Sequence, residues 1–430
     1  MSRKVKIDSL SEEQRDIILK ELKIEVKGSS YSKFAPSKYV YPFDSDEDYV
    51  YIPFSYGSSF KRPSKDSFTL TNNKFKGTLR PMQKDIKSEA IKHLNKTGSS
   101  IISAYPGAGK TCLSIYISTK IGLKTLIITH RIVLIKQWKE SLKKFCPGAK
   151  VQIVTAKKKL DSECDFYIMN ATNVPKHRVD EFGDIGFVIV DEVHLIMAEG
   201  LSKSMQKLVP RYVLGLSATP YRDDELNILL ELYFGKNKIF RKLHREHTVY
   251  TVKTNFVPTS EIGMNGRLNW GKLLDSQCNN EKRNEMIIDI VKYFPDRVFL
   301  ILCKRVEQGK YLVKRLGEEG EDVTSLIGKQ QEYNQSSRIL VGTASKAGTG
   351  FDHPRLNAMI LASDIQAYFI QYLGRCMRTK TGSPIVFDLI DKHNILTKHY
   401  RVRKKVYKEH GGIIKSFSKE FPEFDKLEQY

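Results

Sequence analysis

Short, nearly uninterrupted apolar runs recur through the middle of the chain and alternate with longer amphipathic segments. Such runs suit strands that are buried on both faces, as the strands of a parallel sheet are. Their alternation with helical segments predicts βαβ units and open, doubly wound α/β sheets. We expect strands at 100–104, 125–129, 165–169, 187–190 and 212–216, and again at 297–303, 323–327, 338–341, 358–362 and 384–389.

The two groups of strands predict two α/β domains in tandem. A short helix is expected near the N-terminus between Ser9 and Leu22, with Ser11 as its cap. A helix is also expected in the basic C-terminal tail. The expected parts are a small accessory region with weak β content at 1–78, a first domain at 79–235, a connecting segment at 236–275, a second domain at 276–391 and the tail at 392–430.

The charge of the chain indicates a polyanionic partner. The 430 residues include 71 Lys and Arg against 49 Asp and Glu, a formal net charge of +22. This excess favours nucleic acid ahead of an anionic membrane surface. No apolar run reaches the roughly 18 residues that a membrane-spanning helix needs. The N-terminus has no secretory signal, and the six cysteines contain no CxxC pair, so we expect an intracellular protein without disulfides or zinc.

Residues 104–111 read AYPGAGKT, directly after an expected strand and before an expected helix. Gly107 and Gly109 allow the backbone to turn its N–H groups around phosphate oxygens, which a Cβ would obstruct. Lys110 is placed to reach the β- and γ-phosphates, and Thr111 to ligate Mg²⁺. The sequence therefore predicts a phosphate loop that binds ATP and Mg²⁺. Ala104 replaces the first glycine of the generic pattern, at a strand end where alanine is tolerated.

Two carboxylates follow the apolar run at 187–190. A strand end places Asp191 at the edge where ligands bind in open α/β sheets. We expect Asp191 to hold Mg²⁺, directly or through water, and Glu192 to polarise the attacking water as a general base. His194 is expected either to contact the γ-phosphate or to couple this motif to the next one. Together with the phosphate loop, this motif indicates an ATPase.

The order of the remaining motifs resembles that of superfamily 2 helicases over residues 79–390. DEVH at 191–194 is followed by SAT at 217–219, and residues 371–378 read QYLGRCMR, which matches the sixth helicase motif QxxGRxxR. The resemblance implies two RecA-like domains that move along or unwind nucleic acid with ATP and Mg²⁺. It implies an adenine contact from LRPMQ at 79–83 and a cleft loop from GFD at 350–352.

The resemblance also implies roles for single residues on the ATP side. Arg378 is the implied arginine finger, Arg375 a neighbour that contacts the γ-phosphate, and Gln371 the start of the same motif. His194, Ser217, Ala218 and Thr219 are implied to couple ATP turnover to motion. The implied nucleotide-binding residues are Arg80, Gln83, Tyr105, Pro106, Gly107, Ala108, Gly109, Lys110, Thr111, Gly350 and Asp352.

Nucleic-acid contacts are implied at positions in both domains. Phosphate contacts without sequence readout suit a motor that must pass any sequence. Plain surface charge explains Lys304 and Arg305 equally well, and Trp138 and Trp270 fit packing better than stacking on bases. The implied contact residues are Arg131, Gln137, Thr172, Lys304, Arg305 and Thr343.

Residues 215–224, GLSATPYRDD, resemble the xeroderma-pigmentosum group B type of DNA translocase, phage recombination helicases and poxvirus-type transcript-release helicases. This favours DNA over RNA and implies 3′ to 5′ movement by a monomeric motor, with transcription or repair proteins as candidate partners. The relatives indicate work in the nucleus, the cytoplasm, a viral replication site or the virion. The short segment between Ile327 and Arg338 departs from many relatives. An RNA helicase, a non-unwinding transcript-release or remodelling factor, and an inactive ATP-binding module stay open as alternatives.

Overall fold

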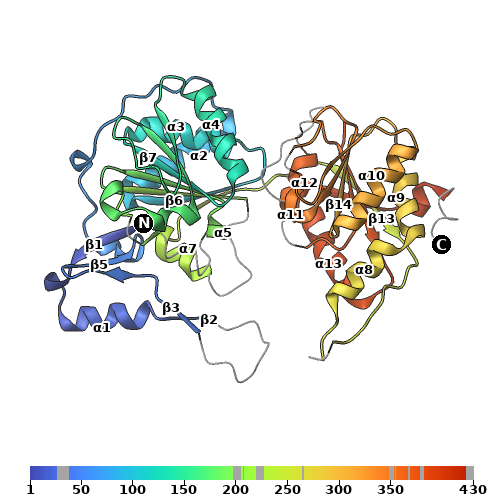
Figure 1. The fold of residues 1–430 in the computed structure, drawn as a ribbon, viewed down its shortest axis with the longest axis horizontal. Coiled ribbons are helices and arrows are strands. Elements are labelled where there is room, and N and C mark those ends of the chain that lie inside the picture. Colours follow the sequence, from blue (N-terminus) through green and yellow to red (C-terminus); the bar gives the residue numbers. More distant parts are fainter. Residues whose placement is uncertain are drawn as a thin grey trace. The chain divides into compact units, whose positions relative to one another are not determined.

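A computed structural model of the chain divides after Arg241 into two compact units, each built on its own sheet (Figure 1). Within the part that it describes, no helix is long and apolar enough to cross a membrane. All six cysteines are free thiols. The described residues are 1–26, 38–196, 205–206, 208–218, 227–263, 266–330, 332–347, 353, 355–366, 369–377 and 382–422.

The first unit contains a seven-stranded parallel sheet with the order β12-β6-β11-β10-β7-β9-β8. The five predicted strands are confirmed at its centre, where β7 and β10 are buried at every position. The strands are β6 (Ser99–Ala104), β7 (Thr125–Thr129), β8 (Val151–Val154), β9 (Phe166–Asn170), β10 (Phe187–Asp191), β11 (Tyr212–Ser217) and β12 (Lys238–Arg241).

Helices cover both faces of this sheet. The α2, α3 and α4 helices pack in sequence on one another, whereas α5 and α7 lie against β11. Their bounds are α2 (Pro81–Thr97), α3 (Lys110–Ile121), α4 (Ile132–Phe145), α5 (Val193–Ile196) and α7 (Asn227–Phe234), with short 3₁₀ turns at Ala171–Lys176 and Val179–Phe182.

The N-terminal region belongs to the first unit rather than standing apart from it. Met1, Val40 and Phe54 are buried in the same apolar cluster as Leu229 and Phe234 of α7. Ser11 caps α1 as predicted, since its hydroxyl accepts from Gln14 N in a capping box. The elements are β1 (Ser2–Lys6), β4 (Asp44–Ser45) and β5 (Tyr49–Pro53) in one antiparallel sheet, α1 (Glu12–Glu21), the pair β2 (Ile24–Val26) and β3 (Lys38–Val40), and 3₁₀ turns at Ile7–Ser9, Tyr56–Ser59 and Lys65–Ser67.

The second unit contains another seven-stranded parallel sheet, with the order β15-β16-β14-β17-β18-β13-β19. The five predicted strands are again confirmed. The strands are β13 (His247–Lys253), β14 (Phe299–Cys303), β15 (Val323–Leu326), β16 (Ile339–Thr343), β17 (Ala358–Leu361), β18 (Ile385–Ile390) and β19 (Gly412–Ser416).

Side chains alternate between the two faces of this sheet, as strand geometry requires. In β14, Phe299 and Ile301 join the core under α9 and α10, whereas Leu300 and Leu302 join the core under α11, α12 and α13. The helices are α8 (Trp270–Asn279), α9 (Glu281–Tyr293), α10 (Val306–Glu318), α11 (Ala344–Ala347), α12 (Phe369–Cys376), α13 (Asn394–Glu409) and α14 (Phe417–Glu420).

Two of the expected parts differ from the structure. The segment 236–275 was expected to connect the domains, but it supplies β12 to the first sheet and β13 to the second. The tail at 392–430 holds the expected helix, α13, and also β19, which pairs with β13. These strands are mixed in polarity because they lie at or beside sheet edges, so they lack the continuous apolar runs of central strands.

Candidate functional site

The phosphate loop lies between the end of β6 at Ala104 and the start of α3 at Lys110. Gly107 and Gly109 have φ angles of +88° and +82°, a region that favours glycine. A Cβ built on Gly109 would lie 2.3 Å from Gln83 Nε2. The loop therefore needs glycine at this position.

Lys110 and Thr111 occupy the first turn of α3. Lys110 Nζ donates to Ala104 O at 2.6 Å, so the ammonium group is held against the end of the strand that precedes the loop. Both side chains are half-buried. A helix N-terminus, backbone N–H groups and an ammonium group thus converge on one loop, which is an arrangement that favours phosphate.

Arg80 and Gln83 contact the same loop from the start of α2. Gln83 Nε2 donates to Ala108 O at 3.0 Å, and an Arg80 guanidinium nitrogen donates to the same carbonyl at 2.5 Å. Gln83 Oε1 also accepts from the backbone N–H of Arg80 at 2.9 Å, which fixes the Gln83 side chain at the start of α2. The structure therefore brings the predicted adenine-contacting segment onto the backbone of the phosphate loop.

Asp191 ends β10 with both carboxylate oxygens engaged. Oδ1 accepts from Glu192 N at 3.0 Å, and Oδ2 accepts from Trp138 Nε1 at 2.8 Å. Burial, followed by the nearby charge of Glu192, raises the pKa of Asp191 to about 6. A nearby cation would oppose this shift, because it would stabilise the ionised carboxylate.

Glu192 is held in a left-handed backbone conformation, with a φ of +50°. Such a conformation costs a non-glycine residue about 1–3 kcal/mol and tends to occur at functional sites. His194 Nδ1 lies 3.6 Å from Glu192 Oε2 and 2.8 Å from Ser217 Oγ at the end of β11. The DEVH and SAT motifs are therefore in direct contact through His194. Ala218 follows Ser217 in the described chain, whereas Thr219 lies outside the described residues.

The nucleic-acid contacts expected in the first domain gather at one sheet edge. β7 and β9 are adjacent and parallel, and Thr129 pairs with Asn170 where both strands end. Arg131 follows β7 as the N-cap of α4, and Thr172 follows β9 in a 3₁₀ turn. Gln137 is exposed further along α4. The structure thus brings Arg131 and Thr172 to the same carboxyl edge.

The second domain repeats this arrangement. β14 and β16 are adjacent and parallel, and Cys303 pairs with Thr343 at their ends. Lys304 is exposed directly after β14. Arg305 instead turns to α8, where its Nε lies 2.8 Å from Asp275 Oδ1 and another guanidinium nitrogen donates to Gly271 O at 3.1 Å. Arg305 therefore holds α8 in place, and Lys304 is the better placed of the two for a phosphate.

The sixth motif starts on α12, which carries Gln371 and Arg375 one turn apart. Gln371 is buried, and its Nε2 has no hydrogen-bond partner among the residues that the structure describes. A buried amide without a partner is costly, which suits a group that serves a ligand. The expected arginine finger Arg378 and the cleft residues Gly350 and Asp352 lie outside the described residues.

Comparisons with known proteins place these motifs in a family. The family model "Type III restriction enzyme, res subunit" matches residues 76–222. "Putative helicase 161L" of Invertebrate iridescent virus 6 is 42% identical over 396 residues, which cover 86% of this chain and 90% of that protein. This chain belongs to the superfamily 2 helicases. The helicase is thus an ATP-dependent enzyme that acts on nucleic acid.

Two further comparisons concern more distant proteins. "DNA 3'-5' translocase XPB2" of Sulfurisphaera tokodaii is 33% identical to the helicase over 382 residues, which cover 75% of this chain and 84% of that protein. Among solved structures, a variant of S. cerevisiae Dbp5 bound to RNA and ADP BeF3 matches with a TM-score of 0.56 at 13% identity, covering 80% of this chain and 92% of that chain. This structural match confirms the tandem RecA-like fold.

Trp138 is the residue of the helicase site that sequence reasoning missed. It packs as expected, at 1% exposure, but it also donates to the carboxylate of Asp191. A buried tryptophan N–H usually has a hydrogen-bond partner, so the sequence did signal that some acceptor must exist. It gave no way to choose Asp191, because the two residues are far apart in the chain and meet only in the fold.

Proposed function

We propose that the helicase is a DNA motor that moves 3′ to 5′ and couples each ATP cycle to a step along a strand. The observation that carries this proposal is the 33% identity to a protein named as a DNA 3′-5′ translocase, over 84% of that protein. The net charge of +22 supports a polyanionic track. The identity to 161L, a viral protein, supports action inside an infected cell.

The glycine-rich loop fits the phosphates of a nucleoside triphosphate. Its left-handed glycines, Gly107 and Gly109, allow the backbone to turn its N–H groups around phosphate oxygens, and at Gly109 they leave room for the side chains of Gln83 and Arg80. In this proposal Lys110 binds the β- and γ-phosphates, and Thr111 and Asp191 hold Mg²⁺. The ion neutralises charge on the phosphates when bound. Tyr105, Pro106 and Ala108 complete the loop, which Arg80 and Gln83 support from behind.

Hydrolysis then needs a base and a source of positive charge. In this proposal Glu192, whose backbone is held in a left-handed conformation, orients and deprotonates the attacking water. Arg375 and Arg378, with Gln371, supply positive charge and hydrogen bonds to the transferring phosphoryl group. Gly350 and Asp352 are assigned to nucleotide binding in this proposal. An arginine finger typically contributes about 10³–10⁵ in rate.

Contacts to the track come from the carboxyl edges of both sheets. Arg131, Gln137 and Thr172 bind phosphates in the first domain, and Lys304 and Thr343 bind them in the second, with Arg305 in a supporting position. Such contacts carry no sequence information, which suits a motor. His194 and Ser217, 2.8 Å apart, link the ATP-binding carboxylates to the SAT segment of Ala218 and Thr219 and thereby couple hydrolysis to movement.

The steady-state ATPase rate of the purified helicase tests the proposal, measured alone and with single-stranded DNA, duplex DNA or RNA. We expect strong stimulation by DNA and little by RNA. The Lys110→Ala variant should lose turnover and keep its fold. Strand displacement from duplexes with 3′ or 5′ overhangs then tests the direction. Stimulation by RNA alone would replace the DNA motor with an RNA helicase, and stimulation without strand displacement would favour a translocating remodeller.

A further inference from the structure

The α13 helix has two unlike sides. Leu396, Arg403 and Tyr407 are buried against the second sheet. The opposite side carries four exposed basic residues. Because an α-helix turns once in 3.6 residues, positions spaced by three and four residues fall on one side of it. These residues are Lys398, Arg401, Lys405 and Lys408, and we refer to them as the α13 basic face.

The α13 basic face lacks the acidic partners that several surface lysines of this domain have. Lys292 pairs with Glu319, Lys314 with Glu318 and Lys415 with Glu420. Within the described ranges, none of the four residues of the basic face has a carboxylate within 4.0 Å. The acidic residue nearest to them along the helix, Glu409, lies 3.9 Å from Lys242. The positive charge of this face is therefore not balanced locally.

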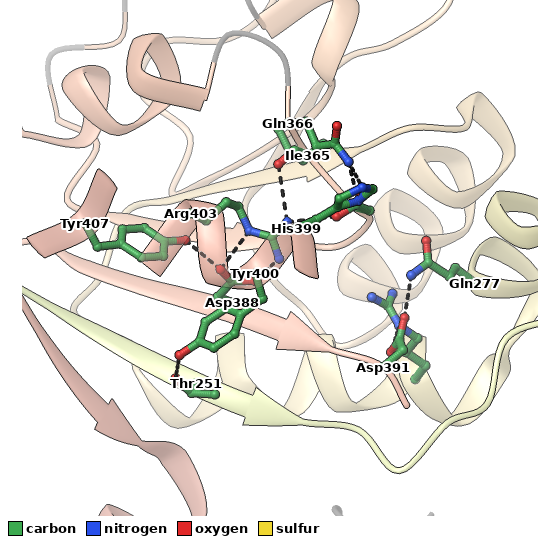
Figure 2. A network of polar contacts seen from close by, with 12 residues as sticks. Thr251, Gln277, Ile365, Gln366, Asp388, Asp391, His399, Tyr400, Arg403 and Tyr407 are labelled. Carbon is green, nitrogen blue, oxygen red and sulfur yellow. Dashed lines mark hydrogen bonds and ion pairs between the residues drawn. The ribbon is translucent and has the colours of Figure 1, made fainter. Parts of the chain in front are cut away.

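The helix that bears this face is firmly anchored (Figure 2). Arg403 forms a fork with Asp388, with Nε to Oδ2 at 2.9 Å and a terminal nitrogen to Oδ1 at 2.8 Å. Its other terminal nitrogen donates to Asp364 Oδ1 at 2.8 Å. Tyr407 donates its hydroxyl to Asp388 Oδ2 at 2.8 Å, and Tyr400 shares a hydrogen bond with Thr251 of β13. The basic face is therefore displayed on a rigid support.

The same anchor connects α13 to the sixth motif. Arg403 contacts Asp364 and the carbonyl of Ile365, and His399 Nδ1 lies 2.8 Å from Asp364 Oδ2. Gln366 also contacts His399. The segment 364–366 shortly precedes α12, which carries Gln371 and Arg375. A ligand bound to the α13 basic face would thus be linked through a few fixed contacts to the segment that leads into α12.

We propose that the α13 basic face binds the phosphate backbone of the nucleic acid on which the helicase acts. The inference rests on the proposed function and adds a contact outside the helicase motifs. From Lys398 to Lys408 the helix rises about 15 Å. A nucleic-acid strand presents a phosphate about every 3.4 Å along its axis, so four cations at this spacing face four to five phosphates. The contact carries no sequence information.

The test compares the wild-type helicase with an Arg401→Gln/Lys405→Gln double variant. Both changes remove charge and keep a helix-forming residue. Binding of a fluorescently labelled DNA duplex is measured by anisotropy over a series of KCl concentrations. Each lost phosphate contact should reduce the slope of log K against log [KCl] by about 0.9, so we expect a slope smaller by about 1.8 and roughly tenfold weaker binding at moderate salt.

A matched control removes two exposed lysines from the other face of the same sheet. Lys282 of α9 and Lys310 of α10 are both exposed, and the Lys282→Gln/Lys310→Gln variant should bind like the wild type. Thermal unfolding of both variants establishes that they are folded. A double variant at 401 and 405 that keeps the wild-type slope overturns this inference alone. A wild-type helicase without affinity for DNA or RNA overturns the proposed function and the inference with it.

Discussion

Trp138 Nε1 donates a hydrogen bond of 2.8 Å to Asp191 Oδ2, and this bond joins α4 to the carboxylate at the end of β10. Trp138 lies on α4, whose N-cap is Arg131 and whose exposed side carries Gln137. Asp191 is the carboxylate that we assign to Mg²⁺. A shift of α4 on binding nucleic acid would therefore act directly on the orientation of this carboxylate.

The Trp138→Phe variant tests this link. Phenylalanine fills most of the buried site but cannot donate the hydrogen bond, which to a charged group is worth about 1.5–3 kcal/mol. We expect the nucleic-acid-stimulated kcat of ATP hydrolysis to fall about tenfold and the Mg²⁺ concentration for half-maximal rate to rise. An unchanged kcat together with an unchanged Mg²⁺ dependence would contradict the assignment.

The chain supplies a control for this experiment, because it contains only two tryptophans. Trp270 lies on α8 in the second domain, and the Trp270→Phe variant should retain the wild-type rate. In that variant Trp138 is the sole tryptophan, so its fluorescence reports on Asp191 directly. We expect the emission to change when Mg²⁺ and a nucleotide bind.

Gly109→Ala should abolish tight ATP binding and leave the fold intact. The added Cβ would lie 2.3 Å from Gln83 Nε2 and 2.9 Å from an Arg80 nitrogen, at a φ of +82°. Left-handed backbone costs a residue with a Cβ about 1–2 kcal/mol, and the clash displaces the support of the loop. Binding of a fluorescent ATP analogue measures the effect, which we expect to exceed tenfold. Gly148→Ala is the control, because nothing lies within 4 Å of its Cβ position.

The position of the candidate site was more predictable from sequence than the contacts that support it. The phosphate loop and the DEVH motif are contiguous, and their chemistry follows from residue types within a few positions of each other. The Trp138–Asp191 bond and the Arg403–Asp388 fork join residues from different elements, so no local pattern encodes them. These contacts depend on how distant elements pack together in the fold.

Phe54→Ala should destabilise the first domain, although Phe54 lies in the N-terminal region. Its side chain is fully buried in the cluster that includes Phe234 of α7. Truncating a buried phenylalanine typically costs about 3–5 kcal/mol. Urea unfolding followed by Trp138 fluorescence, in a Trp270→Phe background, measures the loss. Leu70→Ala, at a side chain that is 64% exposed, should change the free energy of unfolding by less than about 0.5 kcal/mol. An equally small effect of Phe54→Ala would mean that the N-terminal region folds separately.

His130 should make the first domain less stable in mild acid. Burial, then the charges of Arg131 and His194, lowers the pKa of His130 to about 4, and neither ring nitrogen has a hydrogen-bond partner in the described structure. In the unfolded chain His130 therefore becomes protonated below about pH 6.5, whereas in the folded chain it stays neutral down to about pH 4. Stability falls as the pH drops through this window and is unaffected above it.

The size of this effect is open to direct measurement. Allowing for the remaining exposure of the ring, we expect the titration of His130 to lower the free energy of unfolding by about 1–2 kcal/mol between pH 7 and pH 5. The His130→Asn variant, which does not titrate there, should lose correspondingly less stability over the same interval. Parallel urea titrations at the two pH values give the difference. Equal losses in the wild type and the variant would show that His130 is not responsible.

Arg403→Met should destabilise the second domain. Arg403 and Asp388 are almost fully buried, with exposures of 4% and 0%, and the variant leaves a buried carboxylate without its cation. Breaking such a pair from one side costs about 3–5 kcal/mol. Urea unfolding followed by Trp270 fluorescence, in a Trp138→Phe background, measures the loss. Lys314→Met, which breaks the exposed pair with Glu318, should cost less than about 1 kcal/mol. Similar costs for the two variants would contradict a structural role for the Arg403 fork.

The strands that sequence reasoning missed share a physical cause. β13 reads HTVYTVK and β19 reads GIIKS, and neither has the unbroken apolar run of a central strand. β13 pairs with β18, more than a hundred residues later in the chain, so its place in the sheet depends on a partner that local sequence cannot reveal. The predicted central strands, in contrast, are buried on both faces and show this in their composition.

The ends of β12 and β13 fix the covalent connection between the two domains. Arg241 closes one strand and His247 opens the other, and both strands are hydrogen-bonded into their sheets. Only residues 242–246 are left to join them, and even fully extended they let Arg241 and His247 separate by no more than roughly 20 Å. These five residues therefore act as a short covalent tether between the two domains. The tether sets an upper limit on how far the end of β12 and the start of β13 can move apart.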